Sequence, residues 1–411
     1  MPSPSPACLD TLTPEPMHDI DACNDAENDF GIYIHWPFCV SKCPYCDFNS
    51  HVARNGIDSD LWTKMLCAEL DSLHRRARFP KKPVSVFFGG GTPSLMASGS
   101  VAALLETINA HWGISAETEI SLEANPESVS KEKLQAYQSA GVNRLSLGVQ
   151  SFDDAALRAL GRPHDVAQAL SALRTARECF EHVSFDLIYA RPRQSIADWR
   201  TELLRALKLA SEEDIGHISL YQLTIEPGTA YARWHENGQL RLPSDETALE
   251  QLELADELCS QAGLGRYEVS NYARAGEECR HNLLYWRYEF YAGVGPGAHG
   301  RLPGESPRER IATETIRDPA QWLEQVSRRG DGIIRKEPLS PAQQGDEMLL
   351  MGLRLREGVC LQRYARTTST DISGKIDPLL EEGLLWRSGN KFGCTPRGNA
   401  VLNSILAQLL A

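Results

Sequence analysis

The 411-residue sequence lacks features that define several classes of protein. It has no uninterrupted apolar run long enough to cross a bilayer, so we expect no transmembrane helix. It also lacks an excess of positive charge, because 42 Lys and Arg residues stand against 55 Asp and Glu residues, a net charge of −13. A nucleic-acid-binding protein needs a basic face to replace phosphate counterions. We therefore expect no nucleic-acid partner and, at most, peripheral contact with a membrane.

The first 30 residues contain no Lys or Arg, but they include seven acidic residues and several Pro and Ser. A secretory signal begins with basic residues before an apolar stretch, and a transit peptide is rich in Arg and poor in acids. We therefore predict that residues 1–30 form a disordered acidic leader and that the protein is cytoplasmic.

Eleven cysteines occur, and without a recognisable export signal we expect reduced thiols. Eight are scattered, whereas Cys39, Cys43 and Cys46 are closely spaced. Thiolates are soft ligands that suit iron–sulfur clusters or zinc. Structural zinc normally takes four ligands, whereas three thiolates on a four-iron cluster leave one iron open to a small molecule. The spacing favours the cluster, and a zinc knuckle completed by a distant ligand is the alternative.

Six short runs rich in Ile, Val, Leu and Phe alternate with stretches of helical periodicity, which predicts parallel strands joined by helical crossovers. These runs are Gly31–His35, Val84–Phe88, Thr118–Glu123, Asn143–Val149, His182–Ile188 and His217–Leu223. Six such units predict an α/β fold with a partial (β/α)6 barrel, because a full barrel has eight. The three cysteines follow the first run and so belong to the carboxyl end of a strand, where barrels place their chemistry.

Beyond the predicted barrel, which spans residues 31–230, two further regions differ in pattern. Residues 231–340 are rich in Tyr, Trp, Gly and Arg and form an extension whose topology the pattern does not assign. Residues 341–411 read as helix, helix, hairpin and helix, which predicts a small winged-helix-like C-terminal α+β domain. Its basic and acidic residues nearly balance, so we interpret it as a packing or partner module.

The segment Tyr-Ile-His-Trp-Pro-Phe-Cys, from Tyr33 to Cys39, resembles the radical S-adenosylmethionine (SAM) superfamily when Cys43 and Cys46 follow it. It looks in particular like the anaerobic coproporphyrinogen III oxidase family, and the resemblance runs from Tyr33 to the C-terminus. This resemblance implies a radical SAM barrel in which Cys39, Cys43 and Cys46 hold a [4Fe–4S] cluster and SAM is the cosubstrate.

Polar residues and glycines end several of the predicted strands. Consecutive glycines after the second strand allow a ligand to approach the backbone closely, although a tight turn would use them too. Asp186 interrupts an apolar strand, so it needs a polar partner. The resemblance assigns SAM contacts to Tyr33, Gly90, Gly91, Thr92, Glu123, Gln150, Arg162 and Asp186. One departure follows the fifth strand, where relatives usually have Gly-Leu-Pro-Gly-Gln and this chain has Arg191 and Arg193 in place of Leu and Gly. These cations could meet an anionic group such as a propionate, but we favour a solvated surface.

Two further motifs separate branches of the family. The decarboxylating oxidase reads C-x3-C-x2-C-x-C, whereas Phe48 stands here in the last position. The sequence around Phe48 resembles the heme chaperone branch, HemW. His281, Tyr285 and Trp286 lie in a segment that resembles the H-N-x-x-Y-W motif of that branch, which implies heme contacts. Imidazole is a common axial ligand of heme iron. From the residues alone, a structural role for His281 in a local cap and for the two aromatic residues in the core is the alternative.

These patterns predict a heme chaperone that binds heme and passes it to an acceptor hemoprotein, on a radical SAM scaffold with a [4Fe–4S] cluster and SAM. A cellular one-electron reductant would be a further partner. The main alternative is an oxygen-independent coproporphyrinogen III oxidase, and another radical SAM porphyrin-modifying enzyme is a third candidate. We assign no catalytic residue, and whether the protein is an enzyme stays open at this point.

Overall fold

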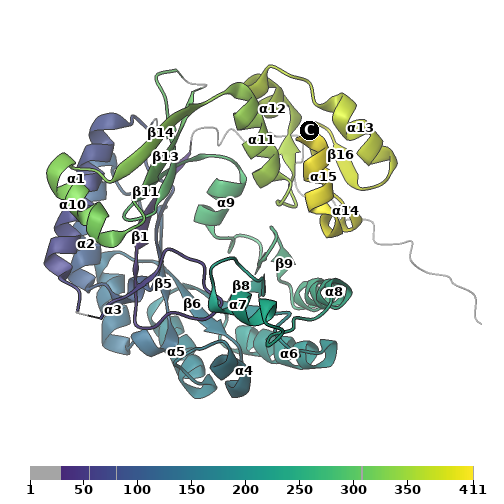
Figure 1. Cartoon of the computed structure of the whole chain (residues 1–411), viewed down its shortest axis with the longest axis horizontal. Coiled ribbons are helices and arrows are strands. Elements are labelled where there is room, and N and C mark those ends of the chain that lie inside the picture. The colour runs from purple at the N-terminus through teal and green to yellow at the C-terminus, as the bar shows by residue number, and fades with distance from the viewer. Residues whose placement is uncertain (1–28, 55, 80, 307–308, 411) are drawn as a thin grey trace, which may run out of the picture.

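The computed structural model describes residues 29–54, 56–79, 81–306 and 309–410, so the predicted leader lies almost entirely outside the described residues. A curved 12-stranded sheet dominates the chain, with helices on its outer face (Figure 1). Its strand order is β14-β13-β12-β11-β1-β4-β5-β6-β7-β8-β10-β9. Among the described residues, no helix has both the length and the hydrophobicity that crossing a bilayer would require.

The centre of the sheet is the predicted barrel. Its parallel strands are β1 (Phe30–Trp36), β4 (Ser85–Gly90), β5 (Glu119–Ala124), β6 (Arg144–Gln150), β7 (His182–Tyr189) and β8 (His217–Gln222). All six predicted runs form strands, with small differences at their ends. The crossovers contain α1 (Ser59–Arg76), η1 (Pro93–Leu95), α2 (Ser98–Trp112), η2 (Pro126–Ser128), α3 (Lys131–Ala140), α4 (Asp154–Ala159), α5 (Val166–Cys179) and α6 (Ile196–Glu212).

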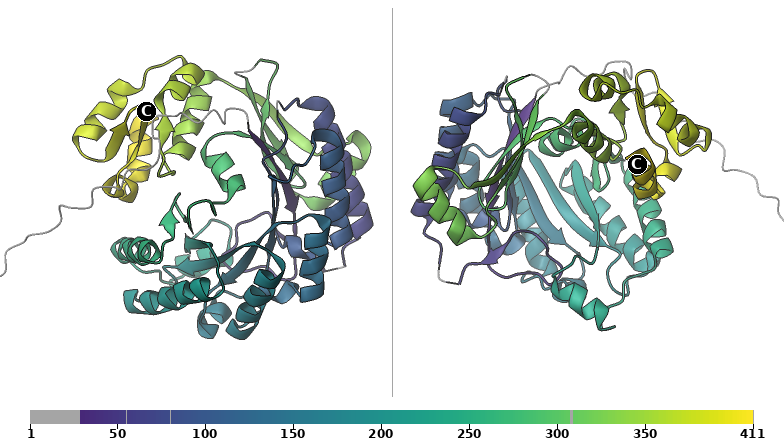
Figure 2. Two further views of the ribbon diagram at one scale, coloured as in Figure 1. Left: turned by 180° about the vertical axis from the view of Figure 1, so that it is seen from behind. Right: turned by 45° about the horizontal axis from the view of Figure 1, so that its top comes forward.

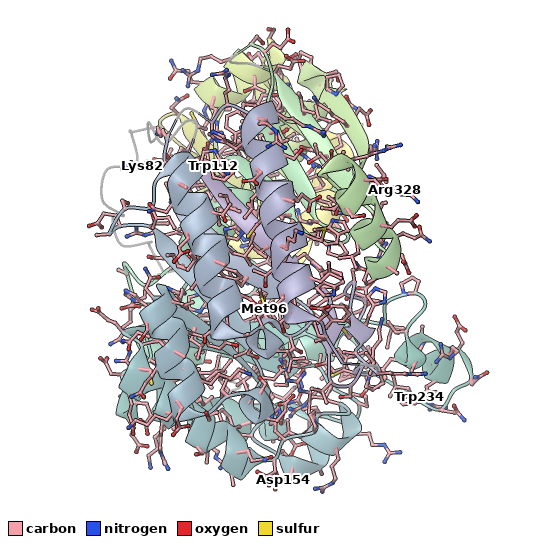
Figure 3. All side chains as sticks on the ribbon, turned by 90° about the vertical axis from the view of Figure 1, so that its left-hand side faces the viewer. Lys82, Met96, Trp112, Asp154, Trp234 and Arg328 are labelled. Carbon is pink, nitrogen blue, oxygen red and sulfur yellow. The ribbon has the colours of Figure 1, made fainter. Side chains whose placement is uncertain are left out.

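The two faces of the barrel strands differ in chemistry because side chains alternate along a strand. Ile32, Ile34 and Trp36 of β1 point outward and are buried in the core that the outer helices cover. Figure 3 views this side, where α1 and α2 run side by side over the sheet. The inner face of the neighbouring strands instead carries polar side chains such as Glu123 and Asp186. The strands therefore bury apolar residues on one face and build a polar interior on the other.

The extension adds strands to both edges of the barrel. Its elements are α7 (Ala230–Glu236), α8 (Asp245–Gln261), β9 (Gly265–Arg266), β10 (Asn271–Ala273), α9 (Arg280–Trp286), β11 (Phe290–Val294), β12 (His299–Pro303), β13 (Arg310–Thr315), α10 (Pro319–Arg329) and β14 (Ile333–Leu339). Strand β11 pairs parallel with β1, and β12, β13 and β14 continue antiparallel from it. At the other edge β10 pairs antiparallel with β8.

The C-terminal residues form a separate group of elements at the open side of the curved sheet (Figure 2). They are α11 (Pro341–Gly352), β15 (Val359–Cys360), α12 (Leu361–Thr368), α13 (Ser373–Glu381), β16 (Leu385–Ser388), β17 (Lys391–Cys394), α14 (Pro396–Ala400) and α15 (Leu402–Leu409). Leu349, Ile376, Phe392 and Ile405 contribute to their own hydrophobic core. The predicted hairpin is β16 and β17, and α12 is a helix that the sequence pattern did not reveal. The predicted fold class is confirmed.

Candidate functional site

The three closely spaced cysteines lie on one loop that is closed at its base. Short strands β2 (Phe38–Cys39) and β3 (His51–Val52) pair parallel with each other and bracket the loop. Inside it, the Cys46 amide donates a hydrogen bond to the Cys43 carbonyl at 3.2 Å. The loop directly follows β1, so its position at the carboxyl end of that strand is fixed by the barrel itself.

The cysteines line a cavity of about 420 Å³ at the carboxyl ends of the barrel strands. Most of the predicted SAM contacts line the same cavity, namely Gly90, Gly91, Thr92, Glu123, Gln150, Arg162 and Asp186. Tyr33 is not among the described residues that line it. Five successive strands or the turns after them thus bring nearly all of the predicted SAM and cluster residues into one place.

Hydrogen-bond donors surround the thiols. Thr92 Oγ1 donates to the sulfur of Cys39 at 3.4 Å, and Arg162 Nη1 donates to the sulfur of Cys43 at 3.5 Å. Burial raises the pKa of the Cys39 and Cys46 thiols. Within the described residues, no three His, Cys, Asp or Glu side chains converge closely enough to hold a single metal ion. A four-iron cluster does not need three side chains to converge on a single ion, because each thiolate binds a different iron.

Arg162 lines the cavity and is held there by polar partners. Its Nη2 donates to the Asn125 Oδ1 at 2.5 Å and to the Gly148 carbonyl at 3.0 Å. Its Nε has no hydrogen-bond partner among the described residues, but this atom is buried and is not open to a ligand in the cavity. The guanidinium as a whole places positive charge at the cavity wall, which favours a carboxylate such as that on the methionyl part of SAM.

Asn125 is a site residue that sequence reasoning missed. It follows β5 directly, two residues after Glu123, and it lines the cavity. A side chain at Gly148 would place its Cβ 2.9 Å from the Asn125 Oδ1, so the glycine is what allows Asn125 to approach Arg162. The signal was present in the sequence, because Asn125 stands at the end of a strand beside an assigned residue.

Two carboxyl groups, Glu123 of β5 and Asp186 of β7, line the cavity. Burial is the main reason why the pKa of Glu123 is raised to about 8, and the charge of Asp186 adds to this effect. The Gly90 amide acts in the opposite direction, because it donates a hydrogen bond to the Glu123 carboxylate. Burial likewise raises the pKa of Asp186 to about 6, against hydrogen bonds from Ser219 and Ser146 and the charge of Arg162. A cationic group in the cavity would favour the ionised form of both. SAM carries such groups, an ammonium and a sulfonium.

Tyr33 lies deeper in the barrel and connects through His35 with the loop between β2 and β3 that carries the three cysteines, called the cluster loop below. The Tyr33 hydroxyl donates to His35 Nδ1 at 3.0 Å, and His35 Nε2 donates to the Asn49 carbonyl at 2.9 Å. Burial lowers the pKa of His35, so the ring is neutral and can accept one hydrogen bond and donate another. The predicted role of Tyr33 in SAM contact stays a prediction.

The glycine turn after β4 packs on the backbone of the cluster loop. The Gly91 amide donates to the Trp36 carbonyl at 2.7 Å, and a Cβ on Gly91 would lie 2.7 Å from the Phe38 carbonyl oxygen. Gly90 has a φ of +112°, which favours glycine. Gly91 is therefore required by its packing on Phe38, one residue before Cys39, and Gly90 by its positive φ, whatever the two contact in a ligand.

The predicted heme residues lie at the opposite end of the barrel interior. Helix α9 packs against the first residues of β1 and β4, and His281 Nδ1 shares a hydrogen bond with Ser85 Oγ at 2.8 Å. Its Nε2 shares another with the Tyr285 hydroxyl at 2.8 Å. Burial lowers the pKa of His281 to about 3. Trp286 faces away and meets the Arg354 guanidinium, whose carbon lies 5.9 Å from the ring centroid.

The two unusual arginines after β7 have different surroundings. Arg191 is buried and forms an ion pair with Glu202 of α6, which also accepts hydrogen bonds from Ser151 Oγ and the Phe152 amide. The expectation of a solvated surface is therefore wrong for Arg191, because the buried Glu202 carboxylate needs a cationic partner. Arg193 is exposed, as expected.

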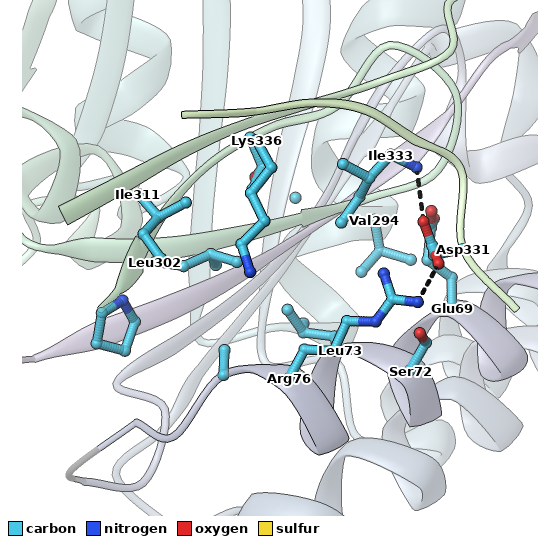
Figure 4. Close-up of a pocket in the computed structure, with 14 residues that line it drawn as sticks. Glu69, Ser72, Leu73, Arg76, Val294, Leu302, Ile311, Asp331, Ile333 and Lys336 are labelled. Atoms are coloured by element: carbon cyan, nitrogen blue, oxygen red, sulfur yellow. Dashed lines mark hydrogen bonds and ion pairs between the residues drawn. The ribbon is translucent and has the colours of Figure 1, made fainter. Parts of the chain in front are cut away.

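A second cavity, between α1 and the outer face of the extension strands, is far smaller, about 30 Å³ (Figure 4). Beside it, the buried Glu69 carboxylate accepts hydrogen bonds from the Gly295 and Gly332 amides, at 2.7 and 2.6 Å. Arg76 pairs with Asp331 at 2.6 Å across the same seam. These contacts fasten the extension to α1, and the space suits only about one or two waters.

The sequence has clear relatives. Residues 33–219 match the radical SAM superfamily, and residues 339–401 match the HemN C-terminal domain. The heme chaperone HemW of Mycobacterium tuberculosis is 35% identical over 384 residues, which cover 93% of this chain and 95% of the relative. The Escherichia coli HemW is 34% identical, with 92% and 98% covered. A bovine protein, radical S-adenosyl methionine domain-containing protein 1, mitochondrial, is 39% identical, with 92% and 87% covered.

Among solved structures, the coproporphyrinogen III oxidase HemN of Escherichia coli has a TM-score of 0.77 at 21% identity, with 93% of this chain and 90% of that chain covered. At this identity the likeness establishes the fold. The match to the radical SAM superfamily supports a [4Fe–4S] cluster and SAM as the cofactors of the barrel. Together with the extent of the match to the bacterial relatives, these findings show that the chain belongs to the HemW family of radical SAM proteins.

Proposed function

We propose that this protein is a heme chaperone, which binds heme and delivers it to an acceptor hemoprotein. The relatives named heme chaperone support this function. The observation that carries it within this chain is Phe48. Phe48 stands where the oxidase pattern has a fourth cysteine, and its side chain is 61% exposed at the wall of the cluster cavity. An exposed aromatic ring there offers apolar contact and no metal ligand.

We assign the cluster to Cys39, Cys43 and Cys46. When bound, such a cluster supplies an electron to its ligand. The residues of the chain bind and orient: the Arg162 guanidinium is placed to receive a carboxylate, and Glu123 and Asp186 are placed to receive cationic groups. Gly90 and Gly91 hold the turn after β4 against the cluster loop, where Thr92 donates to Cys39.

For heme we assign His281 as the axial ligand. Burial keeps its imidazole neutral, which is the form that binds iron. In the present arrangement both ring nitrogens are hydrogen-bonded, so the ring is not free to ligate. Heme binding at His281 Nε2 therefore requires the Tyr285 hydroxyl to leave. Tyr285, on the same helix, would then supply aromatic contact to the porphyrin. Trp286 meets Arg354 instead, so its heme contact stays a prediction from the sequence.

A heme titration with matched variants tests this assignment. His281→Ala should lower heme affinity and change the heme absorption spectrum while the cluster stays intact. Tyr285→Phe should raise affinity, because it removes the hydroxyl that competes for Nε2 and keeps the ring. His299→Ala, at an exposed histidine of β12, is the control and should bind heme as the wild type does. Unchanged heme binding in His281→Ala would contradict the ligand assignment, and loss in His299→Ala would move it to β12.

The enzymatic alternative is tested on the same preparation. The wild type, reconstituted without oxygen and supplied with SAM and a reductant, should not convert coproporphyrinogen III to protoporphyrinogen IX. Measurable decarboxylation would contradict the chaperone function and favour the oxidase.

The partners and location follow from this proposal. An acceptor hemoprotein and a one-electron donor are the expected protein partners, and the proposed location is the cytoplasm. Fractionation of cells that express the full chain tests the location. Crosslinking of the heme-loaded protein to the proteins that it contacts tests the partners. Recovery in an organellar fraction would contradict the location, which matters because the bovine relative is named mitochondrial.

A further inference from the structure

Three polar side chains form one hydrogen-bonded chain across two of the cysteines. Arg162 donates to Asn125 Oδ1 at 2.5 Å, and Asn125 Nδ2 donates to Thr92 Oγ1 at 3.2 Å. At its two ends the chain reaches sulfur: Thr92 donates to Cys39 at 3.4 Å and Arg162 to Cys43 at 3.5 Å. The central residue, Asn125, contacts neither sulfur itself.

The orientation of the Asn125 amide is fixed by its partners. A guanidinium can only donate, so the oxygen of the amide faces Arg162 and its nitrogen faces Thr92. Because the Thr92 oxygen accepts from that nitrogen, the hydroxyl proton of Thr92 is directed to the sulfur of Cys39. The nitrogen of the Asn125 amide thus orients the Thr92 hydroxyl toward Cys39, and its oxygen positions the Arg162 guanidinium beside Cys43.

Hydrogen bonds to ligand sulfurs alter the reduction potential of an iron–sulfur cluster, because they stabilise the more negative, reduced state. We propose that Asn125 is a positioning residue that holds Thr92 and Arg162 against the sulfurs of Cys39 and Cys43 and thereby raises the reduction potential of the cluster. The proposal rests on the function proposed above, in which these cysteines hold a [4Fe–4S] cluster.

The third sulfur has donors of its own. The sulfur of Cys46 lies 3.8 Å from Ser50 Oγ, and the Phe48 amide donates a further hydrogen bond to it. Asn125 contacts neither Ser50 nor Phe48, so its proposed effect is confined to the sulfurs of Cys39 and Cys43. Gly148 of β6 leaves room for Asn125, since a side chain there would collide with the Asn125 oxygen.

The test compares two substitutions of Asn125 with one of Asn143, an asparagine that bonds the opposite end of β5. Asn125→Ala removes both contacts. Asn125→Asp keeps the shape and the acceptor for Arg162, but it removes the N–H donor, so the Thr92 hydroxyl turns toward the new carboxylate and away from Cys39. Asn143→Ala is the control, because Asn143 bonds the Ile120 amide and Thr118 carbonyl at the amino end of β5, away from the cavity.

The measurement is a redox titration of the anaerobically reconstituted full chain without SAM, followed by electron paramagnetic resonance, with iron and sulfide quantified. Both Asn125 variants should retain the cluster and titrate at a more negative midpoint potential, and Asn143→Ala should titrate with the wild type. A wild-type potential in both Asn125 variants, each with full iron content, would overturn the proposal. A wild type without any [4Fe–4S] signal would instead overturn the proposed function, so the two failures are distinguishable.

Discussion

The rings of Tyr33 and His281 stack on each other inside the barrel, with centroids 6.3 Å apart and planes 27° from parallel. Tyr33 is linked to the cluster loop by hydrogen bonds through His35, and His281 belongs to the predicted heme motif on α9. The cluster cavity and the heme motif therefore occupy opposite ends of one interior, and this stacked pair is a direct contact between the groups that belong to each.

The cluster assignment predicts a distinct pattern among the cysteines. Cys39→Ser, Cys43→Ser and Cys46→Ser should each lose most of the iron and sulfide, because each removes one of three ligands. Cys67→Ser is the control, since Cys67 lies on α1 and its sulfur accepts a hydrogen bond from Thr107. Iron and sulfide analysis after anaerobic reconstitution measures the effect. A full [4Fe–4S] spectrum in Cys43→Ser would refute the assignment.

Gly91→Ala should perturb the cluster loop. The new Cβ would lie 2.7 Å from the Phe38 carbonyl oxygen, which is backbone and must shift. We expect a loss of about 1–3 kcal/mol in stability, as for overpacked cores, together with reduced iron retention. In Gly99→Ala of α2, nothing lies within 4 Å of the added Cβ, so this control should be neutral or stabilising by about 0.4–1 kcal/mol. Urea unfolding and iron analysis compare the two, and equal behaviour would contradict the packing argument.

SAM binding should release protons near pH 7. Burial and Asp186 raise the pKa of Glu123 to about 8, so this carboxyl is mostly protonated at pH 7 before a ligand binds. A bound cation favours the carboxylate and lowers that pKa, and the proton leaves. SAM affinity should therefore rise from pH 7 to about 8 and then level off. Calorimetry in two buffers of different ionisation enthalpy measures the release, and Glu123→Gln should abolish it. A proton count of zero for the wild type at pH 7 would rule this out.

The buried ion pair predicts contrasting effects for the two arginines after β7. Arg191→Ala leaves the Glu202 carboxylate buried without its cation, which should cost about 3–5 kcal/mol of stability. Arg193→Ala, at an exposed position, should change stability by less than about 0.5 kcal/mol. Denaturant unfolding of the two variants decides, and a small effect of Arg191→Ala would mean that the pair is dispensable.

The barrel could be predicted from sequence because its information is local. Each strand is a short apolar run followed by an amphipathic helix, and parallel crossovers bring the strand ends together. The order of strands and motifs along the chain is therefore enough to bring most of the predicted cluster and SAM residues to one end of the barrel. The extension could not be predicted in this way, because its strands pair with partners far away in the sequence, as β11 does with β1.

Features that depend on tertiary partners could not be predicted for the same reason. The sequence favours a surface position for Arg191, because its partner, Glu202, lies in a helix whose inward face only the fold defines. Asn125 stands at the end of a predicted strand, but its contacts depend on Gly148 and Arg162, which lie on the next strand and beyond. The motif on α9 marks His281, but the two hydrogen bonds of its ring depend on how α9 packs in the barrel.

Heme transfer is the most direct test of the chaperone function. Heme-loaded wild-type protein, with the cluster reconstituted, is mixed with an apo-hemoprotein, and the absorption of the acceptor is followed against a control of free heme at the same concentration. We expect that the acceptor gains heme while the protein loses it, and that His281→Ala loads less heme and delivers correspondingly less. Heme that stays on the wild type, or transfer no different between the wild type and His281→Ala, would contradict the chaperone function as assigned here.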